Sequence, residues 1–229
     1  MRQKNDSETA QIGQKKKIQR NLIEAVVAYI AFCGLGFLSR LFPLLFLLFV
    51  IYGIVFPLAW AKFSGRWFAI GFRKNNFKKA LLWGVIAGVV WGVYTYVVFG
   101  VDQSLPPLWA LQVAIAVPFW FLIMSPFQEF FFRGWLQPKV QSAFGKPAGL
   151  IITSLAFTLW HFFPQLEGTP TSTLPISSPI GILSTFLAGL LFGYIYQRTE
   201  NIITPWVAHA LGGVALVLMG MMSFFKYIP

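Results

Sequence analysis

Long apolar stretches recur through the chain and dominate what it can fold into. They cover residues 22–38, 41–61, 80–99, 108–126, 127–143, 147–163, 179–196 and 203–225. A helix needs about 20 apolar residues to cross a bilayer, and it keeps its backbone hydrogen bonds internal where lipid offers no partner. We therefore predict an all-α, polytopic transmembrane bundle of about eight helical segments. Residues 1–21 form a polar basic tail, and residues 22–229 form one transmembrane domain.

The composition excludes an ordinary soluble fold. Of the 229 residues, 57% are hydrophobic and 11% are charged, whereas charged residues make up roughly a quarter of a soluble domain. A water-soluble core cannot bury so much apolar surface. The single cysteine, Cys33, excludes an intramolecular disulfide framework.

The net charge of +11 belongs to short basic blocks between the apolar stretches. Residues 1–20 and 62–79 hold six Lys and Arg residues each. Basic residues stay on the cytoplasmic side of membrane proteins, so we predict a cytoplasmic N-terminus, with the Asp102 loop and the loop 164–178 outside. A prokaryotic plasma membrane is the default location. Membrane lipids are the expected partners of the basic blocks, and nucleic acid is not.

Few ionisable residues lie deep in the apolar segments. Glu129 is the only deep carboxylate, and both histidines, His161 and His209, lie within apolar segments. Each buried ionisable group costs several kcal/mol, so such groups face the bundle interior and find partners. Glu129 and His161 each lie sixteen residues from the turn expected at Gly145, which places them at similar depth if both arms are helical. We predict one shared intramembrane site.

Two other readings of these residues remain open. Arg133 follows Glu129 by four residues, so the pair could simply join two helix ends, although this leaves both histidines unexplained. Glu129, His161 and His209 could also bind zinc with an open position for water. No His-Glu-x-x-His motif is present, and we predict no tightly bound metal. Ser125 lacks the Gly-x-Ser-x-Gly context of a serine nucleophile.

Three short motifs in order resemble the CPBP family, which includes the CAAX prenyl proteases and the bacteriocin-processing or immunity (Abi) proteins. Gln128-Glu129-Phe130-Phe131-Phe132-Arg133 is similar to its Glu-Glu-x-x-x-Arg motif. Phe157-Thr158-Leu159-Trp160-His161 is similar to its Phe-x-x-x-His motif, and His209 matches its His-x-x-x-Asn/Asp motif. The resemblance covers about residues 108–220.

Two positions depart from the family pattern, because Gln128 replaces the first Glu and Gly213 replaces the Asn or Asp. The resemblance implies that the first Glu and the second-motif His activate water, while the third motif stabilises the oxyanion. Gln128 can orient water but cannot take up its proton. Either Glu129 takes over as base, or Gln128 is an engineered inactivation, or the chain is a pseudoprotease.

The resemblance implies an intramembrane endopeptidase that cleaves a peptide or lipidated protein near the membrane interface. In this hypothesis Glu129 and His161 activate water, Gln128 positions it and His209 donates to the oxyanion. Arg133, Phe157 and Gly213 support the site, in a cavity that segments four to eight build and that opens toward the cytoplasm. The alternatives are a catalytically impaired binding scaffold and a proton-coupled transporter, which should show internal repeats that the chain lacks.

Overall fold

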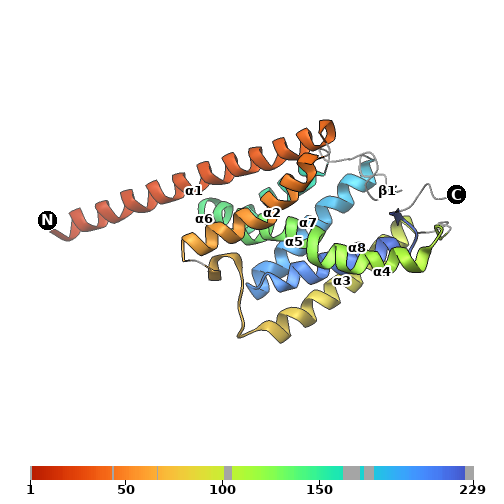
Figure 1. Ribbon diagram of the computed structural model, residues 1–229. Coiled ribbons are helices and arrows are strands. Elements are labelled where there is room, and N and C mark those ends of the chain that lie inside the picture. The colour runs from red at the N-terminus through yellow and green to blue at the C-terminus, as the bar shows by residue number, and fades with distance from the viewer. Residues whose placement is uncertain are drawn as a thin grey trace.

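Figure 1 shows the computed structural model, a bundle of long helices. It describes residues 2–42, 44–65, 67–100, 105–161, 171–172 and 178–224, and of residues 2–10 and 171–172 the backbone alone. Besides helices, the described residues contain one antiparallel pair of two-residue strands. The elements are α1 (Arg2–Leu41), α2 (Leu44–Phe63), η1 (Trp67–Ile70), α3 (Phe77–Phe99), α4 (Trp109–Phe119), η2 (Trp120–Met124), α5 (Ser125–Glu129), η3 (Phe130–Leu136), α6 (Gln137–Trp160), β1 (Thr171–Ser172), α7 (Pro179–Thr199), α8 (Ile203–Leu218) and β2 (Met222–Ser223).

The predicted all-α membrane bundle is confirmed. By length and composition, five helical stretches among the described residues are able to cross a membrane: Gln11–Leu41, Leu44–Phe63, Phe77–Phe99, Trp109–Trp160 and Pro179–Thr199. Ile203–Leu218 is a shorter apolar helix. Because these helices satisfy their own backbone groups, their apolar side chains can face lipid at no hydrogen-bonding cost.

The expected segments 108–126 and 127–143 are one continuous helical arm. Elements α4, η2, α5 and η3 run without a break into α6, which turns sharply at Gly145. Gly145 has φ +81°, a backbone conformation that favours glycine. The predicted turn at Gly145 is therefore confirmed. The described arms are α1, α2, α3, 109–144, 146–160, α7 and α8, which is seven rather than about eight.

Glycines allow the close helix contacts that their spacing predicts. Helix α3 packs on α8, and α6 packs on α7. A Cβ atom at Gly88 would lie 2.7 Å from Leu211 Cβ, and one at Gly193 would lie 2.5 Å from Leu150 Cδ1. Larger residues at these positions would push the helices apart.

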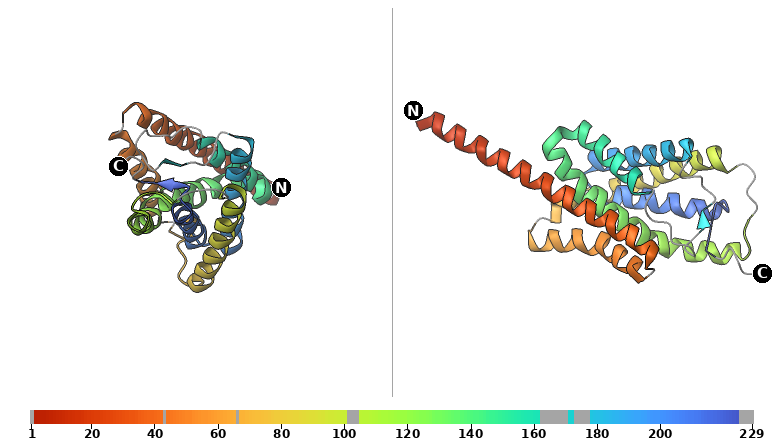
Figure 2. Two further views of the ribbon diagram at one scale, coloured as in Figure 1. Left: turned by 90° about the vertical axis from the view of Figure 1, so that its right-hand side faces the viewer. Right: turned by 90° about the horizontal axis from the view of Figure 1, so that it is seen from above.

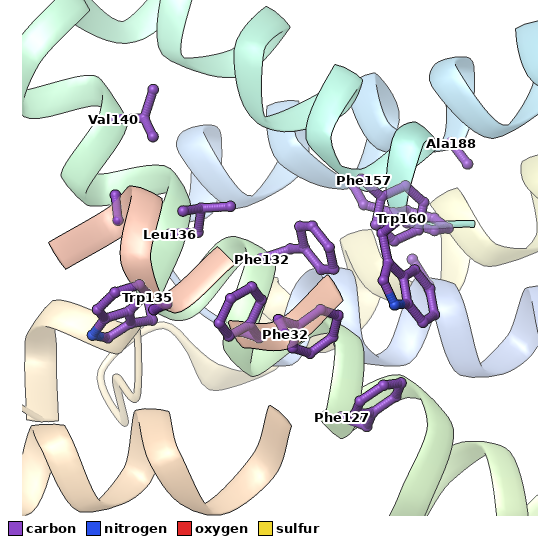
Figure 3. Packing of buried hydrophobic residues seen from close by; sticks show 14 of the residues in the cluster. Phe32, Phe127, Phe132, Trp135, Leu136, Val140, Phe157, Trp160 and Ala188 are labelled. Atoms are coloured by element: carbon purple, nitrogen blue, oxygen red, sulfur yellow. The ribbon is translucent and has the colours of Figure 1, made fainter. Parts of the chain in front are cut away.

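An aromatic cluster fixes α1 and α2 against the long arm. The Phe32 ring stacks on Phe131 with centroids 4.1 Å apart and meets Phe49 edge-on at 4.7 Å. Figure 3 shows Phe32 between Phe127, Phe132 and Trp160. Phe131 and Phe132 are fully buried in this cluster, so they pack the core and do not line a groove for a lipid chain.

The two ends of the bundle differ in charge. Lys62, Lys78, Lys146 and Arg198 lie near helix ends on the side to which the N-terminal part of α1 projects (Figures 1 and 2). We call this the basic end. The opposite end holds the starts of α2, α4 and α7 and the ends of α3 and α8, and its described residues carry only Arg40 as a Lys or Arg. Asp102 lies outside the described residues, and of the loop 164–178, also predicted to be extracytoplasmic, only β1 and Ser178 are described.

Candidate active site

Gln128 and Glu129 lie on α5 between two π-helical stretches, η2 and η3. Such wide turns in an α-helix occur frequently at functional sites. Pro118 and Pro126 lie just before and just after η2, and prolines remove backbone donors from the regular helical ladder.

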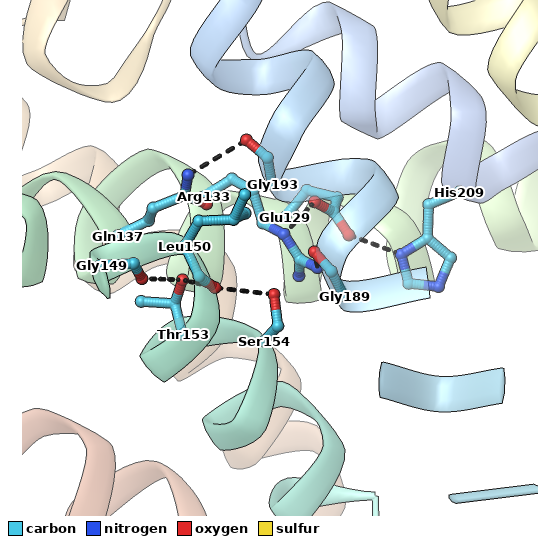
Figure 4. Close-up of polar contacts among 10 residues, drawn as sticks. All are labelled: Glu129, Arg133, Gln137, Gly149, Leu150, Thr153, Ser154, Gly189, Gly193 and His209. Carbon is cyan, nitrogen blue, oxygen red and sulfur yellow. Dashed lines mark hydrogen bonds and ion pairs between the residues drawn. The ribbon is translucent and has the colours of Figure 1, made fainter. Parts of the chain in front are cut away.

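The Glu129 carboxylate is fully buried between a cation and an imidazole. Its Oε1 accepts a hydrogen bond from His209 Nδ1 at 2.7 Å, and its Oε2 lies 3.3 Å from Arg133 Nε. Figure 4 shows the row that runs from Gln137 through Arg133 and Glu129 to His209. Burial of a carboxylate is tolerated because both oxygens face opposite charge or a donor.

Backbone and aromatic groups hold the Arg133 guanidinium. Arg133 donates from Nη2 to the Gly189 carbonyl at 3.2 Å, and its Cζ lies 4.3 Å from the centre of the Phe157 ring. The structure thus brings together the predicted pair Glu129 and Arg133. Phe157, expected only as a motif residue, becomes the cation–π partner of Arg133.

His161 follows the second arm of the hairpin that turns at Gly145, and a contact with the backbone of that arm holds its ring. Its Nδ1 lies 2.7 Å from the Phe157 carbonyl oxygen. A carbonyl can only accept, so Nδ1 carries the proton and the neutral ring keeps its lone pair on Nε2. Glu129 is paired with His209, and the structure shows no bond between Glu129 and His161.

One cavity joins most of the predicted site residues. It has a volume of about 170 Å³ and is lined by Gln128, Phe157, His161, His209 and Gly213, among others. A cavity of this size has room for several water molecules. Gln128 is 3% exposed, and its Oε1 has no hydrogen-bond partner among the described residues. Glu129 and Arg133 lie behind this wall and do not line the cavity.

The cavity extends in the direction opposite to the one predicted. Beyond the histidines its walls are Thr95 and Phe99 of α3, Gly181 of α7 and Met222, all toward the opposite end. The sequence predicted an opening toward the basic end, the predicted cytoplasmic side, whereas these lining residues lie on the other side of the histidines. Sequence position alone could not show which helix faces enclose space.

Trp120 is a site residue that the sequence did not indicate. A Cβ atom at Gly213 would lie 2.0 Å from Trp120 Cδ2, so the indole occupies the space of any side chain at position 213. Trp120 also lines the cavity, and its buried Nε1 has no partner among the residues described. The His209 ring lies between it and Phe192, with centroids 5.8 and 5.0 Å away. The only signal in the sequence would have been the glycine at position 213, where the family has a side chain, together with an additional aromatic residue, Trp120.

The residues considered for zinc are not arranged as three ligands of one ion. Within the described part of the chain, no group of three or more His, Cys, Asp or Glu side chains could hold a metal. Glu129 Oε1 and His209 Nδ1 bond each other, and His161 Nδ1 bonds a carbonyl. The present geometry does not fit a zinc site.

Comparison with known proteins supports the motif reading. Residues 106–215 match the family model described as type II CAAX prenyl endopeptidase Rce1-like. The match spans both histidines, Gln128 and Glu129. Neither the comparison with curated proteins nor that with solved structures gives a match.

Proposed function

We propose, from the premise that residues 106–215 belong to the type II CAAX prenyl endopeptidase Rce1-like family, that the chain hydrolyses a peptide or lipidated protein within its membrane cavity. At family level it is an intramembrane CAAX-type protease. One observation carries the finer proposal: Gln128, His161 and His209 line one small cavity, and His209 is bonded to a buried carboxylate.

His209 is the proposed general base, with Glu129 acting through it. Glu129 does not line the cavity, so its carboxylate has no route to a water molecule there. It bonds His209 Nδ1 at 2.7 Å, which leaves Nε2 to accept a proton from the attacking water. The carboxylate then stabilises the imidazolium, as in other carboxylate–histidine pairs. On collapse of the tetrahedral intermediate, His209 returns the proton to the leaving amine.

The remaining polar groups are proposed to position water and substrate. One hydrogen of the attacking water goes to His209, and the other can be accepted by the Nε2 lone pair of His161 or by Gln128 Oε1, which has no partner among the described residues. The indole N–H of Trp120, which has no partner among the described residues, is the proposed donor to the oxyanion, and its ring fills the space that a side chain at position 213 would need. Donors already in place where charge develops give large rate effects, because they need no reorganisation during the reaction.

The test is a cleavage assay with the purified protein in proteoliposomes and a panel of lipidated and unlipidated peptides. We expect cleavage by the native chain and faster cleavage by Gln128→Glu, because a second base then faces the cavity. His209→Gln should lose most of its activity while retaining its thermal stability. Absence of cleavage in both the native chain and Gln128→Glu, across the panel, would reject the hydrolase.

A binding scaffold is the second candidate, favoured by Gln128 and Gly213 themselves. Position 128 lacks the Glu that the resemblance assigns to water activation, and position 213 lacks the Asn or Asp that it assigns to oxyanion binding. A scaffold would hold a membrane peptide in the cavity without cutting it, and His209→Gln would then change its binding or stability but no turnover.

The proposed reaction uses no tightly bound metal. Protein dialysed against a strong chelator should keep its peptidase activity and contain no stoichiometric zinc. Loss of activity that zinc restores would reject this part of the proposal.

A further inference from the structure

The site lies close to the middle of the helices that enclose it. Gly88 of α3 packs against Leu211 and Ala208 on either side of His209, so Gly88 marks the depth of His209. It lies eleven residues from each end of α3 (Phe77–Phe99), or about 16 Å at 1.5 Å per residue. A substrate must therefore reach the site from one of the two ends or from the lipid.

From the site to the opposite end, the cavity follows one face of α3 and one face of α7. On α3 its walls are Trp91, Thr95 and Phe99, spaced four residues apart along one side of the helix. On α7 they begin at Gly181, two residues from the helix start, and continue to Phe192. The Phe192 ring stacks on His209 with centroids 5.0 Å apart. The lined space thus spans the distance from the histidines to the end that carries few charges.

From the site to the basic end, buried side chains fill the interior. Glu129 and Gln137 are fully buried, and Arg133 is 2% exposed. Gln137 donates to the Gly193 carbonyl at 3.1 Å, next to the contact between Arg133 and Gly189. These bonds join the long arm to α7. None of these buried residues lines the cavity that contains the histidines.

The charge of the two ends identifies the membrane side. Lys and Arg residues gather at the basic end, and the positive-inside rule makes that end cytoplasmic. The opposite end, to which the cavity runs, is then extracytoplasmic.

We infer that the peptide enters from the extracytoplasmic end, so the substrates are exported or membrane-anchored proteins whose cleavage site lies outside the cytoplasm. This inference rests on the proposed function for its substrate class. The cavity walls are largely apolar, with the hydroxyls of Thr95, Ser184 and Thr185 as the exceptions before the histidines. An extended segment with small or apolar side chains fits such walls.

Thiol labelling tests the route without requiring turnover. In a Cys33→Ala background, which removes the only cysteine, single cysteines are placed at Gln14, Arg40, Thr185 and Leu183. The full-length protein in right-side-out and inside-out vesicles is treated with a charged, membrane-impermeant thiol reagent. Gln14→Cys reports the side of the N-terminal tail, and Arg40→Cys reports the other side, since both positions are exposed.

We expect Thr185→Cys to react from the same side as Arg40→Cys, and from that side only. Leu183→Cys is the matched control, because Leu183 lies two residues away on α7, is 49% exposed on the outer surface and does not line the cavity. It should not react from either side, since a thiol in lipid is not ionised. Labelling of Thr185→Cys from the Gln14 side, or from neither side, would overturn the inference.

A second arm separates the route from the chemistry. Oriented proteoliposomes receive the same peptide panel on one side at a time. Cleavage only from the Arg40 side supports the inference. Cleavage only from the Gln14 side rejects the inference while the proposed hydrolase stands. Labelling as expected without cleavage from either side rejects the proposed hydrolase and leaves the access side established.

Discussion

At the scale of single residues, Glu129 and His209 are proposed to act as one catalytic unit. A comparison of the two single variants with the double variant tests this. His209→Gln removes the proposed base and should lower kcat by about 10²–10⁴-fold. Glu129→Gln keeps a hydrogen-bond acceptor beside His209 Nδ1 but removes the charge that stabilises the imidazolium. If Glu129 acts only through His209, the double variant should be no slower than His209→Gln alone. An additive loss, measured as kcat in proteoliposomes, would mean that Glu129 contacts the water directly.

Trp120 offers the second test at this scale. Trp120→Phe keeps an aromatic ring beside Gly213 but removes the indole N–H, which has no partner among the described residues. We expect kcat to fall by about 10²–10³-fold, with little change in KM, because an oxyanion donor acts in the transition state. Trp135→Phe is the control. It also removes a buried indole N–H without a partner in the described part of the chain, but Trp135 does not line the cavity. Equal effects of the two substitutions would show that packing, and not donation, explains the loss.

At the scale of elements, a polar junction fixes the basic end of α3 to the turn between α7 and α8. Asn201 donates to the Arg73 carbonyl at 2.8 Å and to Asn76 Oδ1 at 2.6 Å, and its own Oδ1 accepts from Ile203 N at 3.1 Å. Asn201→Ala leaves these partly buried groups without their partner, so we expect a loss of about 1–3 kcal/mol in unfolding free energy. A lower Tm in detergent measures it. Asn21→Ala removes one exposed hydrogen bond to Ser142 and should leave the Tm nearly unchanged; an equal drop would contradict the assigned role of Asn201.

The helices themselves were predictable, and their continuity was not. Apolar length alone predicts a helix in lipid, and Gly145 followed by Pro147 predicts the turn. Pro126 suggested a break between residues 126 and 127. The chain instead widens locally into η2 and η3 and continues. A proline inside a buried helix can be absorbed by such local adjustment, so one residue type does not decide where an arm ends.

For the whole molecule, the cost of burying charge made the set of site residues predictable. Glu129, Arg133 and the two histidines are expensive in an apolar bundle, and the structure gathers them at one level. Their pairing depends on helix rotation, which the sequence does not encode locally. Hence the bond of Glu129 to His209, the indole of Trp120 beside Gly213 and the direction of the cavity all required the structure.

The predicted orientation of the whole molecule rests on positive charge that several loops share. Lys15, Lys16 and Lys17 supply part of it, but the described cationic residues of 62–79, Lys146 and Arg198 lie at the same end. Each loop contributes separately to the positive-inside bias. Replacing the three tail lysines by Gln should therefore leave the orientation unchanged.

Labelling of Gln14→Cys in the Cys33→Ala background measures this orientation. We expect the reagent to label Gln14→Cys from one side of the membrane only, as in the protein that keeps its tail lysines. Replacing Lys74, Lys78 and Lys79 as well removes the second block of positive charge and should give a mixed population. If the tail substitutions alone invert or mix the orientation, the tail determines topology by itself. The extracytoplasmic assignment of the cavity would then depend on three residues that lie far from the site.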